Sequence, residues 1–201
     1  MEQGSMNDST RKWEDFLNPE ILRTKLITAS MYLTAFELLK DGIIDRVKGF
    51  YITGFDENET EVSTTYNTEV LSLNKSHLYA SLLWLKRQGV IDDDDLAAFE
   101  SIKNCRNAVA HELQRIVAGD MEIAFVEHFP ALISLLRKIE VWWIVNLEIP
   151  INPDFDSAEI DESGIVPGVV MTIQLMFEIA LGEPEKAAYF LNEFKRRQKE
   201  Q

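Results

Sequence analysis

Apolar side chains recur every three to four residues along most of the chain, which is the spacing of amphipathic α-helices. The longest such run begins at Asn18, a helix-capping residue, followed by a proline that suits the first helical position. A proline at position 130 is expected to start a new turn or to kink the helix around it. The pattern predicts helices over residues 19–50, 76–88, 92–117, 120–148, 169–181 and 185–200. The fold class is therefore expected to be all-α, a bundle of four to five main helices with a C-terminal helical extension.

Breaks in the pattern divide the chain into three parts. Residues 1–18 are expected to form a polar tail with a short docking turn of Trp13, Phe16 and Leu17, and residues 19–149 a helical domain. Residues 150–201 begin with a proline-containing break and an acidic connector. They end in a helical pair that is expected to pack on the bundle or at a dimer interface.

One segment inside the helical domain lacks the helical pattern. Residues 51–73 are rich in Thr, Asn and Glu and are expected to form a long loop, with a short extended piece near residues 61–66. Loops of this length are uncommon in compact domains and are often functional. The segment is therefore expected to lie near the functional site and to shape substrate access.

The predicted helix over residues 92–117 carries an unusual set of polar side chains. An aspartate run, residues 92–95, caps its start, and Gly119 closes its end. At about 100° per residue, one buried face collects Ala98, Ile102, Cys105, Val109, Leu113 and Ile116. Arg106 lies at the margin of that face, whereas Asn107 and His111, four residues apart, point away from it together. Two small residues, Ala108 and Ala110, lie between the faces and leave room for another helix.

The sequence Arg106-Asn107-x-x-x-His111 resembles the R-(four to six residues)-H motif of HEPN domains. These are all-helical domains found in prokaryotic RNase toxins and phage-defence proteins. The preceding helix over residues 76–88, the break at Gly89 and the acidic cap also fit, so that the resemblance covers roughly residues 21–148. It implies a HEPN-like helical bundle and a site composed of two motif helices in a homodimer.

Composition restricts the partners and the compartment. A net charge of −14 argues against a broad surface for nucleic acid. Two stretches are locally basic, however, and they nominate weak RNA contacts at Lys103, Lys86 and Arg87. The single cysteine, Cys105, is expected to be a small core residue. No signal peptide and no stretch long enough to span a bilayer are expected, which favours a cytoplasmic protein without membrane contact.

The chemistry expected of this motif is RNA cleavage without a metal or a cofactor, because no metal-ligand spacing and no phosphate-binding loop is present. His111 suits proton transfer, since a histidine side chain has an unperturbed pKa of about 6.5. Arg106 suits a phosphate, because its planar fork donates paired hydrogen bonds, and Asn107 can orient the ring or donate to the phosphate. The arginine and the histidine lie about 140° apart on one helix, so two copies related by a two-fold axis would complete the site.

Other readings of the same residues stay open. Arg106 is also interpretable as an ion-pair anchor to Glu37 or Glu112, although Glu37 itself is expected to be solvated. His77 and His128 are expected to be surface residues. Where HEPN toxins paired with a nucleotidyltransferase antitoxin have a tyrosine, this chain has Leu113, so that particular partner is not predicted. The two function classes are an endoribonuclease of a toxin or phage-defence system, with an antitoxin or regulatory protein as a further candidate partner, and a non-catalytic HEPN scaffold binding RNA, a nucleotide or a protein.

Overall fold

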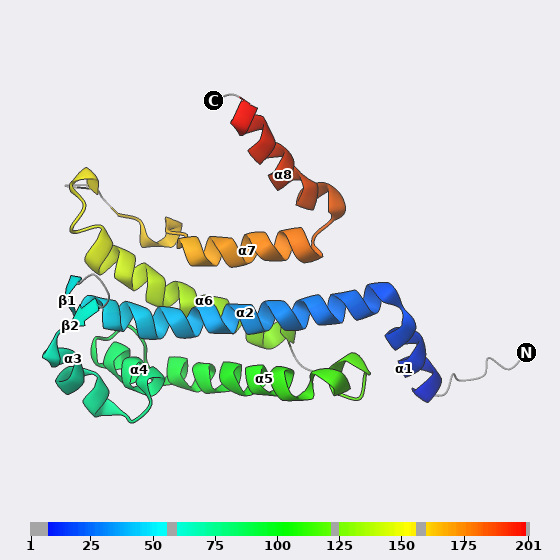
Figure 1. Ribbon diagram of the computed structural model, residues 1–201, viewed down its shortest axis with the longest axis horizontal. Helices are drawn as coiled ribbons and strands as arrows, with labels where there is room; N and C mark the ends of the chain where they lie inside the picture. Colours follow the sequence, from blue (N-terminus) through cyan, green and yellow to red (C-terminus); the bar gives the residue numbers. More distant parts are fainter. Residues whose placement is uncertain (1–7, 56–59, 122–124, 156–159, 200–201) are drawn as a thin grey trace, which may run out of the picture.

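The computed structural model describes residues 8–55, 60–121, 125–155 and 160–199. The chain is almost entirely helical in these ranges, as the apolar spacing predicts (Figure 1). The main elements are α1 (Asp8–Leu17), α2 (Pro19–Phe50), β1 (Ile52–Phe55), β2 (Thr60–Val62), α3 (Thr64–Glu69), α4 (His77–Arg87), α5 (Asp93–Val117), α6 (Phe125–Trp143), α7 (Gly168–Leu181) and α8 (Pro184–Lys199). Short turns lie at η1 (Leu71–Leu73), η2 (the π-helical Ile144–Glu148), η3 (Pro153–Phe155) and η4 (Glu162–Gly164). The all-α class is confirmed.

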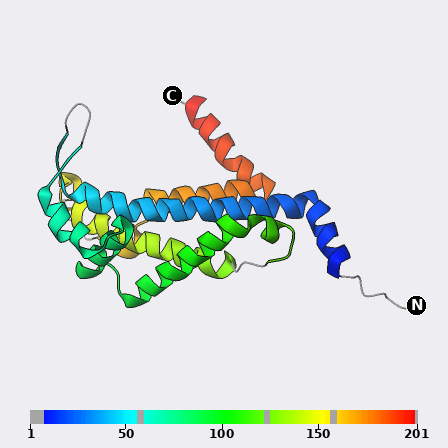
Figure 2. The same ribbon diagram turned by 60° about the horizontal axis from the view of Figure 1, so that its bottom comes forward.

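Helix α2 is the centre of the bundle and packs against α4, α5, α6 and α7. Both views place α5 and α7 on opposite sides of α2 (Figures 1 and 2). The apolar stripe of α2 supplies the middle of the core, including Tyr32, Phe36, Leu39 and Ile43. Neighbouring helices fill the spaces between these side chains, and Cys105 of α5 is buried among them as expected.

The expected helix ends of the motif region are confirmed. Asp92 accepts a hydrogen bond from the backbone N–H of Asp95, and the Asp95 side chain accepts one in return from the backbone of Asp92. Gly119 adopts φ +79°, and the N–H of Asp120 donates to the carbonyl of Arg115 at 2.8 Å, a pattern that favours glycine. Within α5, Glu112 departs from helical geometry (φ −116°, ψ 17°), so the helix bends immediately after the motif histidine.

The long loop expected over residues 51–73 is wrong, because most of the segment has regular secondary structure, although the extended piece expected near residues 61–66 overlaps β2. It forms the antiparallel hairpin β1–β2, then α3, which is capped by Ser63, and then η1. Tyr51, Tyr66 and Val70 are buried and attach the segment to the end of the bundle. Glu37, which contacts the motif, lies 14 residues before Tyr51 on α2, about 21 Å along the axis. The segment is therefore distant from the motif of its own chain.

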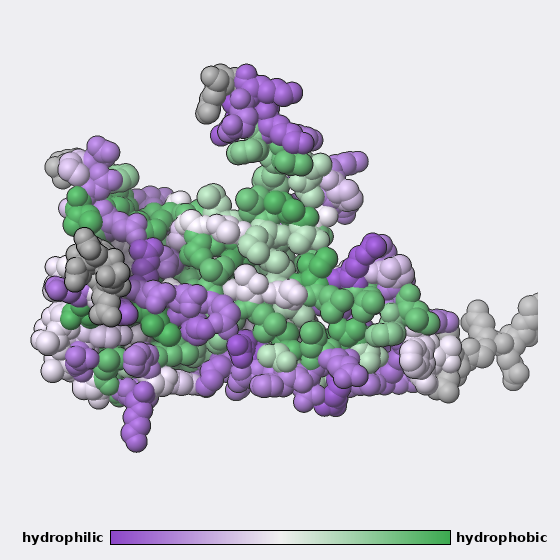
Figure 3. All heavy atoms as spheres, in the orientation of Figure 1, coloured by the Kyte–Doolittle hydropathy of each residue, from purple (hydrophilic) through white to green (hydrophobic). Residues whose placement is uncertain are grey.

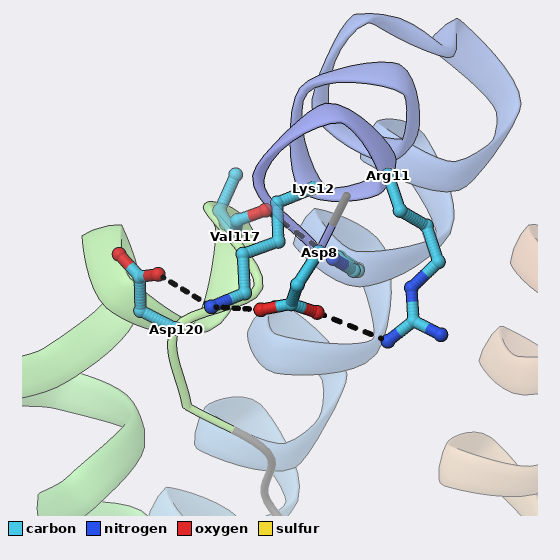
Figure 4. Close-up of polar contacts among 6 residues, drawn as sticks. Asp8, Arg11, Lys12, Val117 and Asp120 are labelled. Atoms are coloured by element: carbon cyan, nitrogen blue, oxygen red, sulfur yellow. Dashed lines mark hydrogen bonds and ion pairs between the residues drawn. The ribbon is translucent and has the colours of Figure 1, made fainter. Parts of the chain in front are cut away.

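The docking turn expected near Trp13 is also wrong, because residues 8–17 form a full helix, α1. Lys12 pairs with Asp8 at 3.2 Å and with Asp120 at 3.3 Å, which ties α1 to the end of α5 (Figure 4). Leu26, expected on the buried face of α2, is 41% exposed. Together with Trp13 and the last turn of α5 it lines an open apolar groove of about 610 Å³.

Helix α7 packs on α2 and α6 through its buried residues Val170 and Ile173, and the rings of Phe177 and Phe129 lie 4.3 Å apart. Within the described residues, the segment Glu162–Leu181 is long and apolar enough to cross a membrane by length and composition alone. The helical part of it, α7, has 14 residues. At 1.5 Å per residue it is about 21 Å long, shorter than the roughly 30 Å of a bilayer core.

Candidate functional site

Arg106 lies at the boundary between α5 and α2, as the helical spacing predicts. Its Nη2 donates to Glu37 Oε1 at 2.9 Å, and its side chain is 33% exposed. The guanidinium carbon lies 5.5 Å from the centre of the Phe36 ring, within the range of a cation–π contact. Of the two ion-pair partners considered from the sequence, the structure therefore selects Glu37. Glu112 pairs instead with Arg115 at 3.1 Å.

Glu37 was expected to be solvated and was also one of two candidate partners of Arg106. Its side chain is 39% exposed and contacts both Lys40 and Arg106. The hydrogen bond from Lys40, reinforced by that from Arg106, holds the pKa of Glu37 below its usual value. A helical wheel of α2 does place Glu37 and Lys40 beside the buried stripe. The wheel carries no information about which residue of α5 faces them, so the sequence leaves Glu37 and Glu112 as alternative partners of Arg106.

The guanidinium of Arg106 is not fully used by these contacts. Its Nη1 donates to Asn107 Oδ1 at a long 3.4 Å. Its Nε is buried and has no hydrogen-bond partner in the described part of the chain. An arginine has five N–H donors, so Arg106 keeps donors for a further acceptor while Glu37 holds its orientation.

His111 and Asn107 lie on the outward face of α5, as predicted. His111 is exposed, and no other residue described in the structure forms a hydrogen bond or ion pair with its ring. Asn107 is half-buried beside Arg106. Ala110 is exposed and Ala108 half-buried, so the surface next to the histidine is shallow. Five residues separate Arg106 from His111, a rise of about 7.5 Å and a rotation of about 140°. One copy of α5 therefore does not bring the guanidinium and the imidazole to a common point.

Of the three nominated RNA-contact residues, only Lys103 lies beside the motif, one helical turn before Arg106 and Asn107. Lys103 points to α4, where it contacts Tyr79 Oη and lies 3.6 Å from Glu100. Lys86 pairs with Asp93 in the first turn of α5. Asp93 lies 13 residues before Arg106, about 20 Å along the helix. Arg87 lines a separate shallow pocket with Ser72, Leu73, Leu83 and Lys86.

The other histidines lie apart from the motif. His77 is exposed in the first turn of α4, as expected. His128 of α6 is half-buried, with its Nδ1 3.5 Å from Ser101 Oγ. The expectation of a surface position is thus only partly met for His128, because α6 packs against α5 there. In the ranges that the structure describes, no group of three or more His, Cys, Asp or Glu side chains is arranged to hold a metal ion.

The arrangement offers one arginine with unused donors, an adjacent amide and a free imidazole on a shallow helical surface. These groups suit the binding of a phosphate and a proton-transfer step. Because the guanidinium and the imidazole of one copy point in different directions, a second copy would have to supply one of them. Comparison with known proteins adds no assignment to this geometry. No protein-family model matches the chain. No curated protein matches it, and neither does any solved structure.

Proposed function

We propose that this protein is a metal-independent endoribonuclease of a toxin or phage-defence system, with its site formed by two α5 helices across a two-fold axis. The observation that supports the proposal best is the exposed, unpaired His111 on the same outward face of α5 as Asn107, with Arg106 at its edge. Small residues between them allow a second helix to approach closely. Two motif helices would bring two guanidinium groups and two imidazoles to one phosphate.

In this mechanism the His111 imidazole of one copy removes the proton from a ribose 2′-hydroxyl. The 2′-oxygen attacks the adjacent phosphorus, and the bond from phosphorus to the 5′-oxygen breaks. The second imidazole, in its protonated form, donates a proton to the leaving 5′-oxygen. The free donors of Arg106 stabilise the charge that develops on the phosphoryl oxygens. The products are a 2′,3′-cyclic phosphate and a 5′-hydroxyl.

A second function, a non-catalytic HEPN-like scaffold that binds RNA, a nucleotide or a protein, is favoured by one observation. The ion pair with Glu37 already neutralises much of the charge of Arg106. In the scaffold, Arg106 would hold α5 against α2, and the outward face of α5 would bind a partner without cleaving it. Lys103, Lys86 and Arg87 remain candidate weak RNA contacts under either function.

The test is cleavage of a mixed RNA substrate in EDTA by the full chain. We expect His111→Ala and Arg106→Ala each to reduce the rate by at least about 100-fold, the usual scale for a proton-transfer group. Asn107→Ala should reduce it less. His77→Ala is the matched control, because it removes an exposed histidine from α4 and should leave the rate unchanged.

The ends of the RNA products identify the reaction. Mass spectrometry should find 2′,3′-cyclic phosphate and 5′-hydroxyl termini. Growth arrest on expression of the wild type, relieved by His111→Ala but not by His77→Ala, would support the same assignment in cells. Cleavage that persists in the His111→Ala protein would refute the catalytic role. An absence of cleavage combined with RNA binding that requires Arg106 would favour the scaffold.

A further inference from the structure

The two C-terminal helices, α7 and α8, expose many large apolar side chains. Helix α7 buries Val170 and Ile173 against α2 and α6, but it is apolar on its outer side as well. Helix α8 leaves the body at an angle after the turn at Gly182 and has no buried residue along its described length (Figure 1). The side chains exposed on this pair, at 36–62%, are Met171, Leu175, Ile179, Leu181, Tyr189, Phe190, Leu191 and Phe194.

The apolar residues of α8 have a regular spacing. Ala187, Phe190, Leu191 and Phe194 recur at intervals of three, one and three residues, the pattern of a helix face that packs against another element. Most helical stability in proteins comes from burial of such a face, and isolated helices of this length are marginal in water. A 16-residue helix with this stripe therefore requires a surface that its own chain does not supply within the described residues.

The size of the exposed surface fits a protein interface. At roughly 150–250 Å² for each aromatic side chain, the exposed fractions of Tyr189, Phe190 and Phe194 alone amount to about 300 Å² on one copy, and the five aliphatic side chains add to this area. Each partner in a standard interface contributes roughly 800 Å², whereas the largest apolar patch on a typical monomer is about 300–600 Å². Figure 3 shows the apolar residues together over α7 and the adjoining part of α8, with hydrophilic residues at the far end of α8.

We propose that the occupant of this surface is a second copy of the chain, bound through an α7–α8 interface with two-fold symmetry. The surface combines an apolar helix face on α7 with a projecting amphipathic helix, α8. The stripe of one copy can therefore pack on the α7 face of the other, and the two-fold axis repeats the contact. The four helices would form a bundle in which both apolar faces are buried.

Charge supports an antiparallel arrangement of α8 along α7 of the second copy. The end of α8 carries Lys195, Arg196, Arg197 and Lys199 on a chain whose net charge is −14. Arg196 and Arg197 pair with Glu193 of the same helix, and this single carboxylate leaves the end of the helix positively charged. Antiparallel packing places this cationic end near the start of α7, which Asp161 and Glu162 precede. Antiparallel helices also oppose their dipoles favourably. An anionic membrane is a poorer occupant, because the strongly acidic body would be repelled from it.

This interface is separate from the motif helix and does not rest on the proposed function. Helix α5 lies on the other side of α2 from α7 (Figures 1 and 2). A dimer through α7 and α8 leaves the outward face of α5 free. If the motif helices also pair, the two contacts together would join the chains into an assembly larger than a dimer.

The test is the mass of the full chain in solution, measured by light scattering and sedimentation over a wide range of concentration. We expect a species of at least twice the 23.1 kDa of one chain, and a larger one where the motif helices also pair. Leu191→Glu on α8 and Ile179→Glu on α7 should each weaken dimerisation at least 10-fold. Ile151→Glu is the matched control, because Ile151 is 77% exposed but lies outside the surface. Thermal unfolding of each variant checks that the bundle is intact.

Hydrogen exchange provides a second measurement on the unmodified protein. Amides of α7 and α8 should lose protection on dilution to the monomer, while those of α2 should not. The proposal is overturned if the chain stays monomeric at every concentration, or if the two glutamate substitutions change neither the mass of the assembly nor the protection of α7 and α8. Flotation of a monomeric wild type with vesicles of phosphatidylserine and phosphatidylcholine, abolished by Leu191→Glu, would overturn it in favour of a membrane.

Discussion

Arg106 of α5 and Glu37 of α2 form an ion pair across the bundle, with Nη2 and Oε1 2.9 Å apart. The two residues are 69 positions apart in sequence. The pair fixes the arginine before any ligand binds, and the long contact of its Nη1 with Asn107 leaves that group able to donate to a ligand. The same pair could instead be a structural anchor between α5 and α2. The coupling energy of the pair and its effect on phosphate binding distinguish an anchor from a ligand-binding arginine.

The first prediction concerns the strength of this pair. Both side chains are between 33% and 39% exposed, so water screens their attraction. A double-mutant cycle with Arg106→Gln and Glu37→Gln should give a coupling of about 0.2–1 kcal/mol in the free energy of unfolding, measured by urea denaturation. If Arg106 also binds phosphate, Glu37→Gln should lower KM for RNA, because it removes a competing carboxylate.

A coupling above about 3 kcal/mol would instead indicate an anchor on which the fold depends. The exposed pair of Arg23 and Glu20, with side chains 69% and 80% exposed, is the matched control cycle. It should give a coupling no larger than that of the motif pair.

The second prediction concerns the ionisation of Glu37. Because Lys40 and then Arg106 stabilise its carboxylate, its pKa should lie below the ordinary 4.5. The resulting stabilisation is present above the unfolded pKa and is lost as the pH falls through the folded pKa. Titration of the side-chain carboxyl signal by NMR should show the depressed pKa. Lys40→Met should raise it towards 4.5, whereas a pKa unchanged by that substitution would contradict the assigned cause.

Local signals along the chain account for most of the fold. Helix α2 begins at the asparagine–proline pair of residues 18–19, and α5 begins at the aspartates of its capping box. Gly119 ends α5. Each of these signals acts through contacts within a few residues. The apolar spacing of α5 also identifies much of its buried face, including Ile102, Cys105 and Val109, but it misses the fully buried Phe99. These features depend on neighbours in sequence, which is why they can be predicted without the structure.

Features that depend on distant contacts were missed or assigned wrongly. The segment after Tyr51 is polar and resembles a loop, but Tyr51 and Tyr66 are buried against the bundle and order it. Helix α1 is held by the pair of Lys12 with Asp120, 108 residues away. The contact of Glu37 with Arg106 likewise depends on how α2 and α5 are placed side by side. Helical periodicity gives the faces of each helix but not their relative rotation and offset.

The third prediction concerns the aromatic cluster that orders this end of the bundle. Trp84 Nε1 donates to Tyr51 Oη at 2.9 Å, and Tyr51 Oη in turn donates to Glu69 Oε2 at 2.6 Å. Tyr51→Phe removes the shared hydroxyl and leaves the buried indole N–H without an acceptor. The free energy of unfolding should fall by about 1–3 kcal/mol. Tyr189→Phe, at a residue 60% exposed on α8, should change it little and is the control.

Alkaline titration gives an independent check on Tyr51. Burial, together with the neighbouring Glu69 carboxylate, raises the pKa of Tyr51 from 10.0 to about 12. The neutral hydroxyl therefore stabilises the fold below pH 10, and this contribution is lost as the pH rises towards 12. In the Tyr51→Phe protein this part of the alkaline loss of stability should be absent. An identical pH dependence in both proteins would contradict the buried position of the hydroxyl.

The fourth prediction concerns Glu140, one of the two buried polar or charged side chains among the described residues. Glu140 of α6 is 4% exposed, and Arg46 of α2 donates to it from Nη2 at 2.6 Å. Arg46→Met would leave the carboxylate buried without its main partner. Because Arg46 is 40% exposed, water can partly compensate. We therefore expect a loss of about 2–4 kcal/mol in the free energy of unfolding, at or below the usual range for a broken buried pair.

The matched variants separate this buried charge from a simple loss of side-chain packing. Arg46→Met combined with Glu140→Leu removes both charges and should recover most of the lost stability, since an apolar pair can replace a buried ion pair without penalty. Arg23→Met breaks an exposed pair and should cost less than about 1 kcal/mol. If Arg46→Met destabilises the protein no more than Arg23→Met does, the carboxylate of Glu140 reaches solvent and the pair does not hold α6 against α2. If the double variant is as unstable as Arg46→Met alone, the loss of the second ion pair of Arg46, with Glu148 at 2.7 Å, rather than the buried charge of Glu140, accounts for the destabilisation.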